Sequence, residues 1–133
     1  CAVFGVLIGM ALDDHPDVRE ALKMRLGRLP EVLVVGDGSG TEEDLRQVQA
    51  LRPDVVIIES KRADGRGLDI IHGIVQSRLG THVIVLTSYP GEWERWTVQH
   101  AGAERYLLKD IGSAELLEQI QSAMAEVVAP FSL

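Results

Sequence analysis

The stretch Val55-Val56-Ile57-Ile58-Glu59-Ser60 (VVIIES) decides the fold, because four apolar residues in a row run directly into a carboxylate. A short, continuous apolar run that does not alternate with polar residues indicates a strand buried on both faces. Strands of this kind occur in parallel sheets that are covered by helices. The acid at the end of the strand is unexpected for a buried segment, and the functional interpretation depends on it.

The same pattern recurs on both sides of this run. Apolar runs of strand length occupy residues 6–12, 32–35, 53–58, 82–87 and 105–109. Apolar residues at helical spacing follow each run, at Val18, Ala21, Leu22, Leu26 and Leu29, at Leu45, Val48 and Leu51, at Leu68, Ile71, Ile74 and Val75, over residues 93–100, and at Leu116, Leu117, Ile120, Met124 and Val127. The alternation predicts an α/β fold, a doubly wound five-stranded parallel sheet with helices on both faces. The 133 residues suit one domain, with its core at about residues 6–127.

Glycine and proline mark the boundaries between these elements. Pro16 suits the first turn of the first helix, and Gly27 and Pro30 mark its end. The glycine-rich residues 36–40 (GDGSG) predict a turn after the second strand, and Thr41 predicts a cap for the next helix.

Composition limits the class of protein. The net charge is -7, which disfavours contact between this domain and nucleic acid. A single cysteine excludes a disulfide framework, and the apolar opening of the chain is too short to span a membrane. We therefore expect a cytoplasmic protein that is not a membrane protein. Because the chain does not begin with Met, we expect it to be a fragment of a longer one.

Polar and charged residues stand where the predicted strands end, at Asp13-Asp14, Glu59, Thr87-Ser88 and Lys109-Asp110. In open α/β sheets, ligands bind at the carboxyl ends of the strands, so these side chains are expected to share one pocket. Three carboxylates at close range need a cation or a raised pKa. Lys109 supplies one positive charge, and Mg²⁺ is the natural second because it prefers oxygen ligands.

Four motifs in order resemble the receiver domain of bacterial two-component response regulators, and in particular the branch that precedes LuxR-type DNA-binding domains. They are ALDDHPDVREAL (residues 11–22), PDVVII followed by an acid (53–59), VIVLTSY (83–89) and GAERYLLKD (102–110). The resemblance covers about residues 10–126. It implies a flavodoxin-like fold with strand order 2-1-3-4-5 and a signalling module rather than an enzyme.

The resemblance also implies a role for each matching residue. The family's metal ligands correspond to Asp13, Asp14 and the acid at position 59, and its phosphate and switch residues to Thr87, Ser88, Tyr106 and Lys109. In the family, the threonine hydroxyl and the lysine contact the phosphoryl group, and the aromatic ring turns inward behind the threonine. The implied partners are a sensor histidine kinase, a second copy of the chain in a homodimer, and DNA through a C-terminal output domain outside this chain.

The pattern departs from the family at the phosphate-accepting position, where Glu59 replaces the usual aspartate. The extra methylene moves the carboxylate by about 1.5 Å, one carbon–carbon bond. In-line phosphoryl transfer requires placement of about that precision. We therefore expect phosphorylation to be impaired or absent, with the domain either locked in an active-like state or inert. An adaptor that works by protein contact, with a vestigial pocket, is the alternative function.

Two further features have competing interpretations. Trp93 and Trp96 lie three residues apart in the fourth helix, and we expect core packing there, with exposure as the alternative. The glycines at residues 36–40 do not follow the dinucleotide-binding spacing, and Asp37 and the acids after it would repel a pyrophosphate. We therefore expect no dinucleotide site.

Overall fold

The computed structural model describes residues 7–13, 15–38, 42–59, 67–78 and 80–125. Five strands alternate with five helices in these residues. They are β1 (Leu7–Leu12), α1 (Pro16–Gly27), β2 (Val32–Gly38), α2 (Glu42–Leu51), β3 (Val55–Ile58), α3 (Gly67–Gln76), β4 (His82–Thr87), α4 (Glu92–Ala101), β5 (Arg105–Leu108) and α5 (Ser113–Ala125). All strand pairs are parallel, and the order in the sheet is β2-β1-β3-β4-β5. The predicted fold class and strand order are confirmed.

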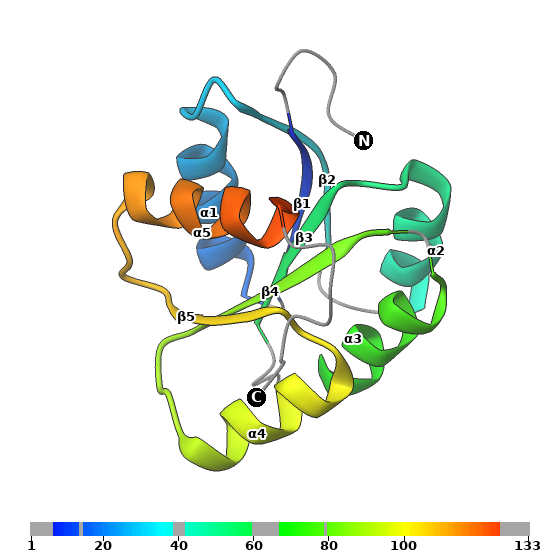
Figure 1. Cartoon of the computed structure of the whole chain (residues 1–133). Coiled ribbons are helices and arrows are strands. Elements are labelled where there is room, and N and C mark those ends of the chain that lie inside the picture. Colours follow the sequence, from blue (N-terminus) through cyan, green and yellow to red (C-terminus); the bar gives the residue numbers. More distant parts are fainter. Residues whose placement is uncertain (1–6, 14, 39–41, 60–66, 79, 126–133) are drawn as a thin grey trace.

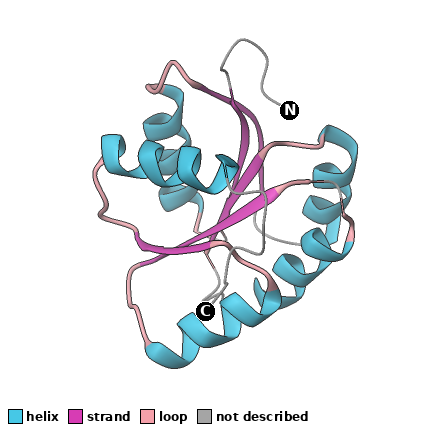
Figure 2. Cartoon of the chain, viewed as in Figure 1, coloured by secondary structure: helices cyan, strands magenta, loops and turns pink. Residues whose placement is uncertain are grey.

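Helices cover both faces of the sheet, with α1 and α5 on one side and α2, α3 and α4 on the other (Figures 1 and 2). Along β3, Val56 and Ile58 belong to the core under α2, α3 and α4, whereas Val55 and Ile57 belong to the core under α1 and α5. Each of these four side chains is almost completely buried. The apolar run is continuous because both faces of this central strand are covered.

β2 extends further than the sequence pattern predicts. Residues 36–38, predicted to start a turn, instead pair with residues 10–12 of β1 after a register shift between Gly9 and Met10. Glycine suits this position because α2 packs closely: a Cβ atom on Gly38 would lie 2.0 Å from the Asp44 carboxylate, which would have to move. The predicted turn is therefore wrong for these residues, while the remainder of it and the Thr41 cap lie outside the described residues.

The prediction that Trp93 and Trp96 pack in the core is wrong. Their exposed fractions are 75% and 51%, and Val98 is the buried residue of α4. The two indole rings stack at 5.5 Å between centroids, and Trp96 stacks on His100 at 3.8 Å. α4 packs against the sheet with the face that carries Val98, which is opposite the tryptophans. The prediction was wrong because it assigned the most hydrophobic side chains of the helix to its buried face.

Three aliphatic residues assigned to helix core faces also have exposed side chains: Leu51, Leu68 and Val75, at 44%, 38% and 38%. In α3, the buried face is instead formed by Ile70, Ile71 and Ile74. Within the described residues, none of the helices has the length and apolar character needed to cross a membrane.

Candidate phosphate-pocket site

The sheet's hydrogen bonds bring the predicted site residues to one edge. The Asp13 N–H donates to the Gly38 carbonyl oxygen at 3.0 Å, and the Glu59 N–H donates to the Leu12 carbonyl oxygen at 3.1 Å. The Lys109 N–H donates to the Thr87 carbonyl oxygen at 2.9 Å. Parallel pairing thus continues one residue past the strands and places these residues side by side.

A single ammonium group joins the two described carboxylates of the cluster. Lys109 Nζ lies 2.8 Å from Asp13 Oδ2 and 3.1 Å from Glu59 Oε2. Asp13 and Glu59 are buried, with 2% and 7% exposure. The other Asp13 oxygen accepts the His15 N–H at 2.9 Å. Both Asp13 oxygens therefore have donors, and Lys109 neutralises part of the buried negative charge.

The balance of forces on Lys109 favours its charged form. Burial lowers the pKa of the Lys109 ammonium, but hydrogen bonds and charge attraction from Asp13 and Glu59 outweigh burial, and the pKa is raised above its ordinary value. The group is therefore a permanent cation at neutral pH.

Arg25, which no sequence motif marks as a site residue, fixes the loop that carries Lys109. Its guanidinium donates from Nη1 to the Lys109 carbonyl oxygen at 2.9 Å and from Nη2 to the Ile111 carbonyl oxygen. Arg19, six residues earlier in α1, donates from Nη1 to the Asp13 carbonyl oxygen at 2.8 Å. Its Nε also lies 3.1 Å from Asp37 Oδ2 in an ion pair. From their positions in α1, both arginines donate hydrogen bonds to backbone carbonyls of site residues. A contact to a backbone carbonyl does not depend on the residue type of its acceptor, so the sequence does not reveal it.

Thr87 and Tyr106 lie behind the charged cluster. Thr87 is fully buried, and its Oγ1 accepts the Tyr89 N–H at 3.2 Å. The Tyr106 ring points inward with 9% exposure and is part of the core under α3 and α4. Burial and the hydrogen bond to Glu94 raise the pKa of the Tyr106 phenol, while hydrogen bonds from Gly91 and with Thr87 oppose the rise.

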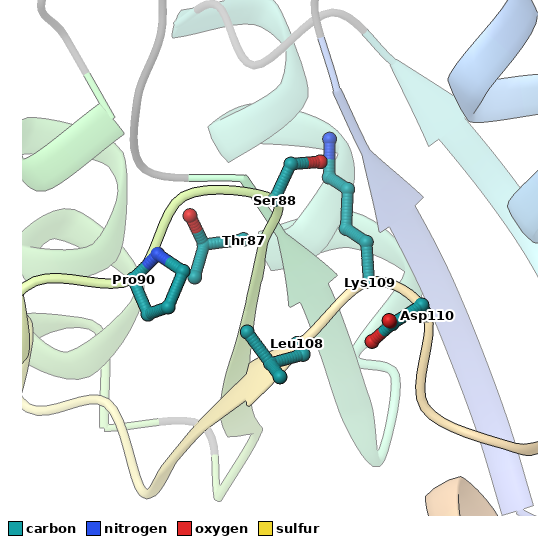
Figure 3. Close-up of a pocket in the computed structure, with 6 residues that line it drawn as sticks. All are labelled: Thr87, Ser88, Pro90, Leu108, Lys109 and Asp110. Carbon is teal, nitrogen blue, oxygen red and sulfur yellow. The ribbon is translucent and has the colours of Figure 1, made fainter.

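An open cleft of about 580 Å³ adjoins the cluster and is lined by Thr87, Ser88, Pro90, Leu108, Lys109 and Asp110. Figure 3 shows the Lys109 side chain extending from the end of β5 toward Ser88, whereas the Asp110 carboxylate stays near the β5 end. Ser88 is exposed, so its hydroxyl is accessible to a molecule in the cleft.

Asp14, the third predicted carboxylate, and the loop after Glu59 lie outside the described residues. Among the residues that are described, no group of three His, Cys, Asp or Glu side chains is arranged to hold a metal ion. The donor chemistry nevertheless fits Mg²⁺, because Asp13 and Glu59 present buried carboxylate oxygens, which are its preferred ligands.

A parallel sheet of this order with acids and a lysine at its carboxyl edge defines a signal-receiver class of domain. The chain belongs to the response regulator receiver domain family, whose model matches residues 10–121. It is 32% identical over 114 residues to the DNA-binding transcriptional activator DevR/DosR of Mycobacterium tuberculosis, covering 86% of this chain and 52% of that protein. It is 28% identical over 116 residues to the nitrate/nitrite response regulator protein NarL of Escherichia coli, covering 87% of this chain and 54% of that protein.

Solved structures agree with this assignment. A LuxR-family two-component response regulator from Aurantimonas sp. superposes with a TM-score of 0.82 at 27% identity, covering 90% of this chain and 86% of that chain. The response regulator domain of Thermotoga maritima CheB gives a TM-score of 0.80 at 25% identity, covering 92% and 99%. The chain spans about half the length of the curated relatives described above.

Proposed function

We propose that this domain is a response regulator receiver that adopts its switch state without phosphoryl transfer to Glu59. The observation that carries the proposal is the contact of 3.1 Å between Lys109 Nζ and Glu59 Oε2. In the family, the lysine is the group that pairs with the phosphoryl oxygens. Here the longer acid reaches that lysine itself.

Charge supports the same conclusion. A phosphoryl group carries almost two negative charges, and Glu59 supplies one, so the mimicry is partial. Lys109 already contacts Asp13 as well as Glu59, so a phosphoryl group would have to compete with two carboxylates for one ammonium. Attack by Glu59 on a phosphoryl donor would also require the carboxylate to leave its ion pair.

The inward Tyr106 ring favours an active-like state over an inert one. In the family, the ring turns inward behind the threonine on activation, and here Tyr106 is buried next to the buried Thr87. Ser88 and Lys109 face the adjoining cleft and complete the set of phosphate-pocket residues.

Mg²⁺ is the proposed cofactor of this pocket, held by Asp13, Asp14 and Glu59. The ion would supply positive charge that Lys109 alone does not provide for three acids. Bound Mg²⁺ would then weaken the pull of Glu59 on Lys109 without requiring phosphate.

The proposed output is regulation of transcription through a homodimer and a DNA-binding domain outside this chain. A sensor histidine kinase would be a binding partner, since the proposal excludes phosphoryl transfer from it to Glu59. Support comes from the curated relatives, which include a transcriptional activator. The exposed, stacked Trp93 and Trp96 also favour a protein contact at α4, because large aromatic side chains anchor interfaces. That surface equally suits the alternative function of an adaptor with a vestigial pocket.

The test is incubation of the protein with acetyl phosphate and Mg²⁺, followed by intact-mass measurement. We expect no phosphoryl adduct on the wild-type chain and an adduct on Glu59→Asp, whose shorter side chain restores the usual geometry of the acceptor. Glu118→Gln, a change at an exposed acid of α5 that does not line the cleft, is the matched control and should behave as the wild type. A stoichiometric adduct on wild-type Glu59 would contradict the proposal.

A further inference from the structure

In its inward position, Tyr106 contacts the N-terminal end of α4 and also forms a hydrogen bond with the Thr87 side chain. The Tyr106 hydroxyl donates a hydrogen bond to Glu94 Oε1 and accepts one from the Gly91 N–H at 3.1 Å. The Arg95 guanidinium carbon lies 5.0 Å from the centroid of the Tyr106 ring, within range of a cation–π contact. The N-cap residue Gly91 and two residues near the start of α4, Glu94 and Arg95, thus contact one side chain of β5.

The Glu94 contact is the strongest of the three by its chemistry. A hydrogen bond from a neutral hydroxyl to a carboxylate is charge-assisted and stronger than a bond between neutral groups. A phenol has one hydrogen to donate, and the inward geometry gives it to Glu94. If the ring turned outward, it would lose this bond, the Gly91 bond and its burial together.

We propose that Glu94 is a positioning residue that holds Tyr106 inward and so sets the switch state of the domain without a phosphoryl group. The inference rests on the proposed function in one respect, namely that the orientation of Tyr106 reports the switch state. The clamp consists of Gly91, Glu94 and Arg95 acting on Tyr106.

The chain offers a direct spectroscopic readout because it contains two tyrosines. Tyr89 has 76% exposure and Tyr106 has 9%, so biosynthetic labelling with 3-fluorotyrosine gives one exposed and one buried ¹⁹F signal. The difference in ¹⁹F shift between H₂O and D₂O measures the solvent contact of each ring. In the wild type, we expect a small isotope shift for Tyr106 and a large one for Tyr89.

The decisive variant is Glu94→Ala, with Glu92→Ala as its control. Glu92 and Glu94 are both acidic residues in the first turn of α4, so they share the same interaction with the helix dipole. The contacts described for Tyr106 involve Glu94 and not Glu92. We expect the Tyr106 isotope shift to increase toward the Tyr89 value in Glu94→Ala and to stay at the wild-type value in Glu92→Ala.

A second variant separates the hydrogen bond from the charge. Glu94→Gln keeps an oxygen that accepts the phenol hydrogen but removes the negative charge, so Tyr106 should stay inward. The pKa of the Tyr106 phenol, followed by ultraviolet absorbance in unlabelled protein, should fall relative to wild type, because the Glu94 carboxylate is one of the groups that raise it.

The inference is overturned if Glu94→Ala leaves the Tyr106 isotope shift unchanged, or if Glu92→Ala changes it equally. Since these measurements use neither acetyl phosphate nor Mg²⁺, they are independent of the phosphorylation test. A phosphoryl adduct on Glu59 would contradict the proposed function, but it would not contradict the inference that Glu94 holds Tyr106 inward.

Discussion

Replacing Lys109 with methionine tests the charge balance of the pocket. Methionine keeps most of the length and the apolar stem of lysine but removes the ammonium group. Asp13 and Glu59 then lose the cation that lies 2.8 and 3.1 Å from their oxygens. Because both acids are buried, water cannot fully replace that cation.

The expected cost follows from the burial of the three groups. Removing one partner of a fully buried ion pair costs about 3–5 kcal/mol, because an uncompensated charge stays behind. The Lys109 side chain is 22% exposed, and the carboxylates are 3% and 8% exposed as side chains, so water screens the pair from one side only. We therefore expect the free energy of unfolding to fall by about 3 kcal/mol, the lower end of that scale.

Urea unfolding followed by far-ultraviolet circular dichroism measures this loss, since the exposed tryptophans report poorly on the core. Lys23→Met is the matched control, because Lys23 makes surface contacts of 3.5 Å to Glu20 and 3.6 Å to Asp37. Such surface pairs contribute about 0–1 kcal/mol. Adding Glu59→Gln to Lys109→Met should restore part of the stability by removing one unpaired charge. If Lys109→Met costs no more than Lys23→Met, the pocket does not depend on this ion pair.

Two further predictions concern packing and pH. Gly38→Ala should lower the free energy of unfolding by about 1–3 kcal/mol through overpacking, because the new Cβ would meet the Asp44 carboxylate. Gly27→Ala is the control and should not lower it, because a Cβ there would have no neighbour within 4 Å. Equal urea midpoints for the two variants would contradict this prediction. The pKa values of Lys109 and Tyr106 are raised in the folded state, so their contribution to stability is complete below their ordinary values of 10.5 and 10.0 and is lost as pH rises through the folded-state values. Urea unfolding at alkaline pH should therefore show a smaller loss in the Lys109→Met, Tyr106→Phe double variant than in the wild type, and an equal loss would contradict the assignment.

Much of the fold was predictable because the signals are local. The run at Val55–Ile58 needs burial on both faces wherever it lies, and that requirement implies covering helices. The carboxyl-edge rule for parallel sheets then predicts that Asp13, Glu59 and Lys109 lie near one another. The extension of β2 through Gly38 was missed, because a glycine that allows close packing looks the same in sequence as a glycine that makes a turn.

The contacts that tune the site were not predictable. Arg25 reaches a backbone carbonyl 84 residues away, and any helical arginine is expected first of all to be solvated. Glu94 contacts Tyr106 only because α4 is rotated so that Val98 is buried and the Trp93 side chain faces solvent. The same apolar content in α4 is compatible with the opposite rotation, in which Trp93 would be buried.

The sequence by itself determined the alternation of strands and helices, the parallel sheet, and the set of acids and one lysine at its carboxyl edge. Periodicity and burial specify these features within short segments of chain. Only the tertiary structure decided that Lys109 joins Asp13 to Glu59 and that Tyr106 lies inward against Glu94. These contacts depend on the rotation of whole helices and on side-chain rotamers, which are set by the packing of both cores together.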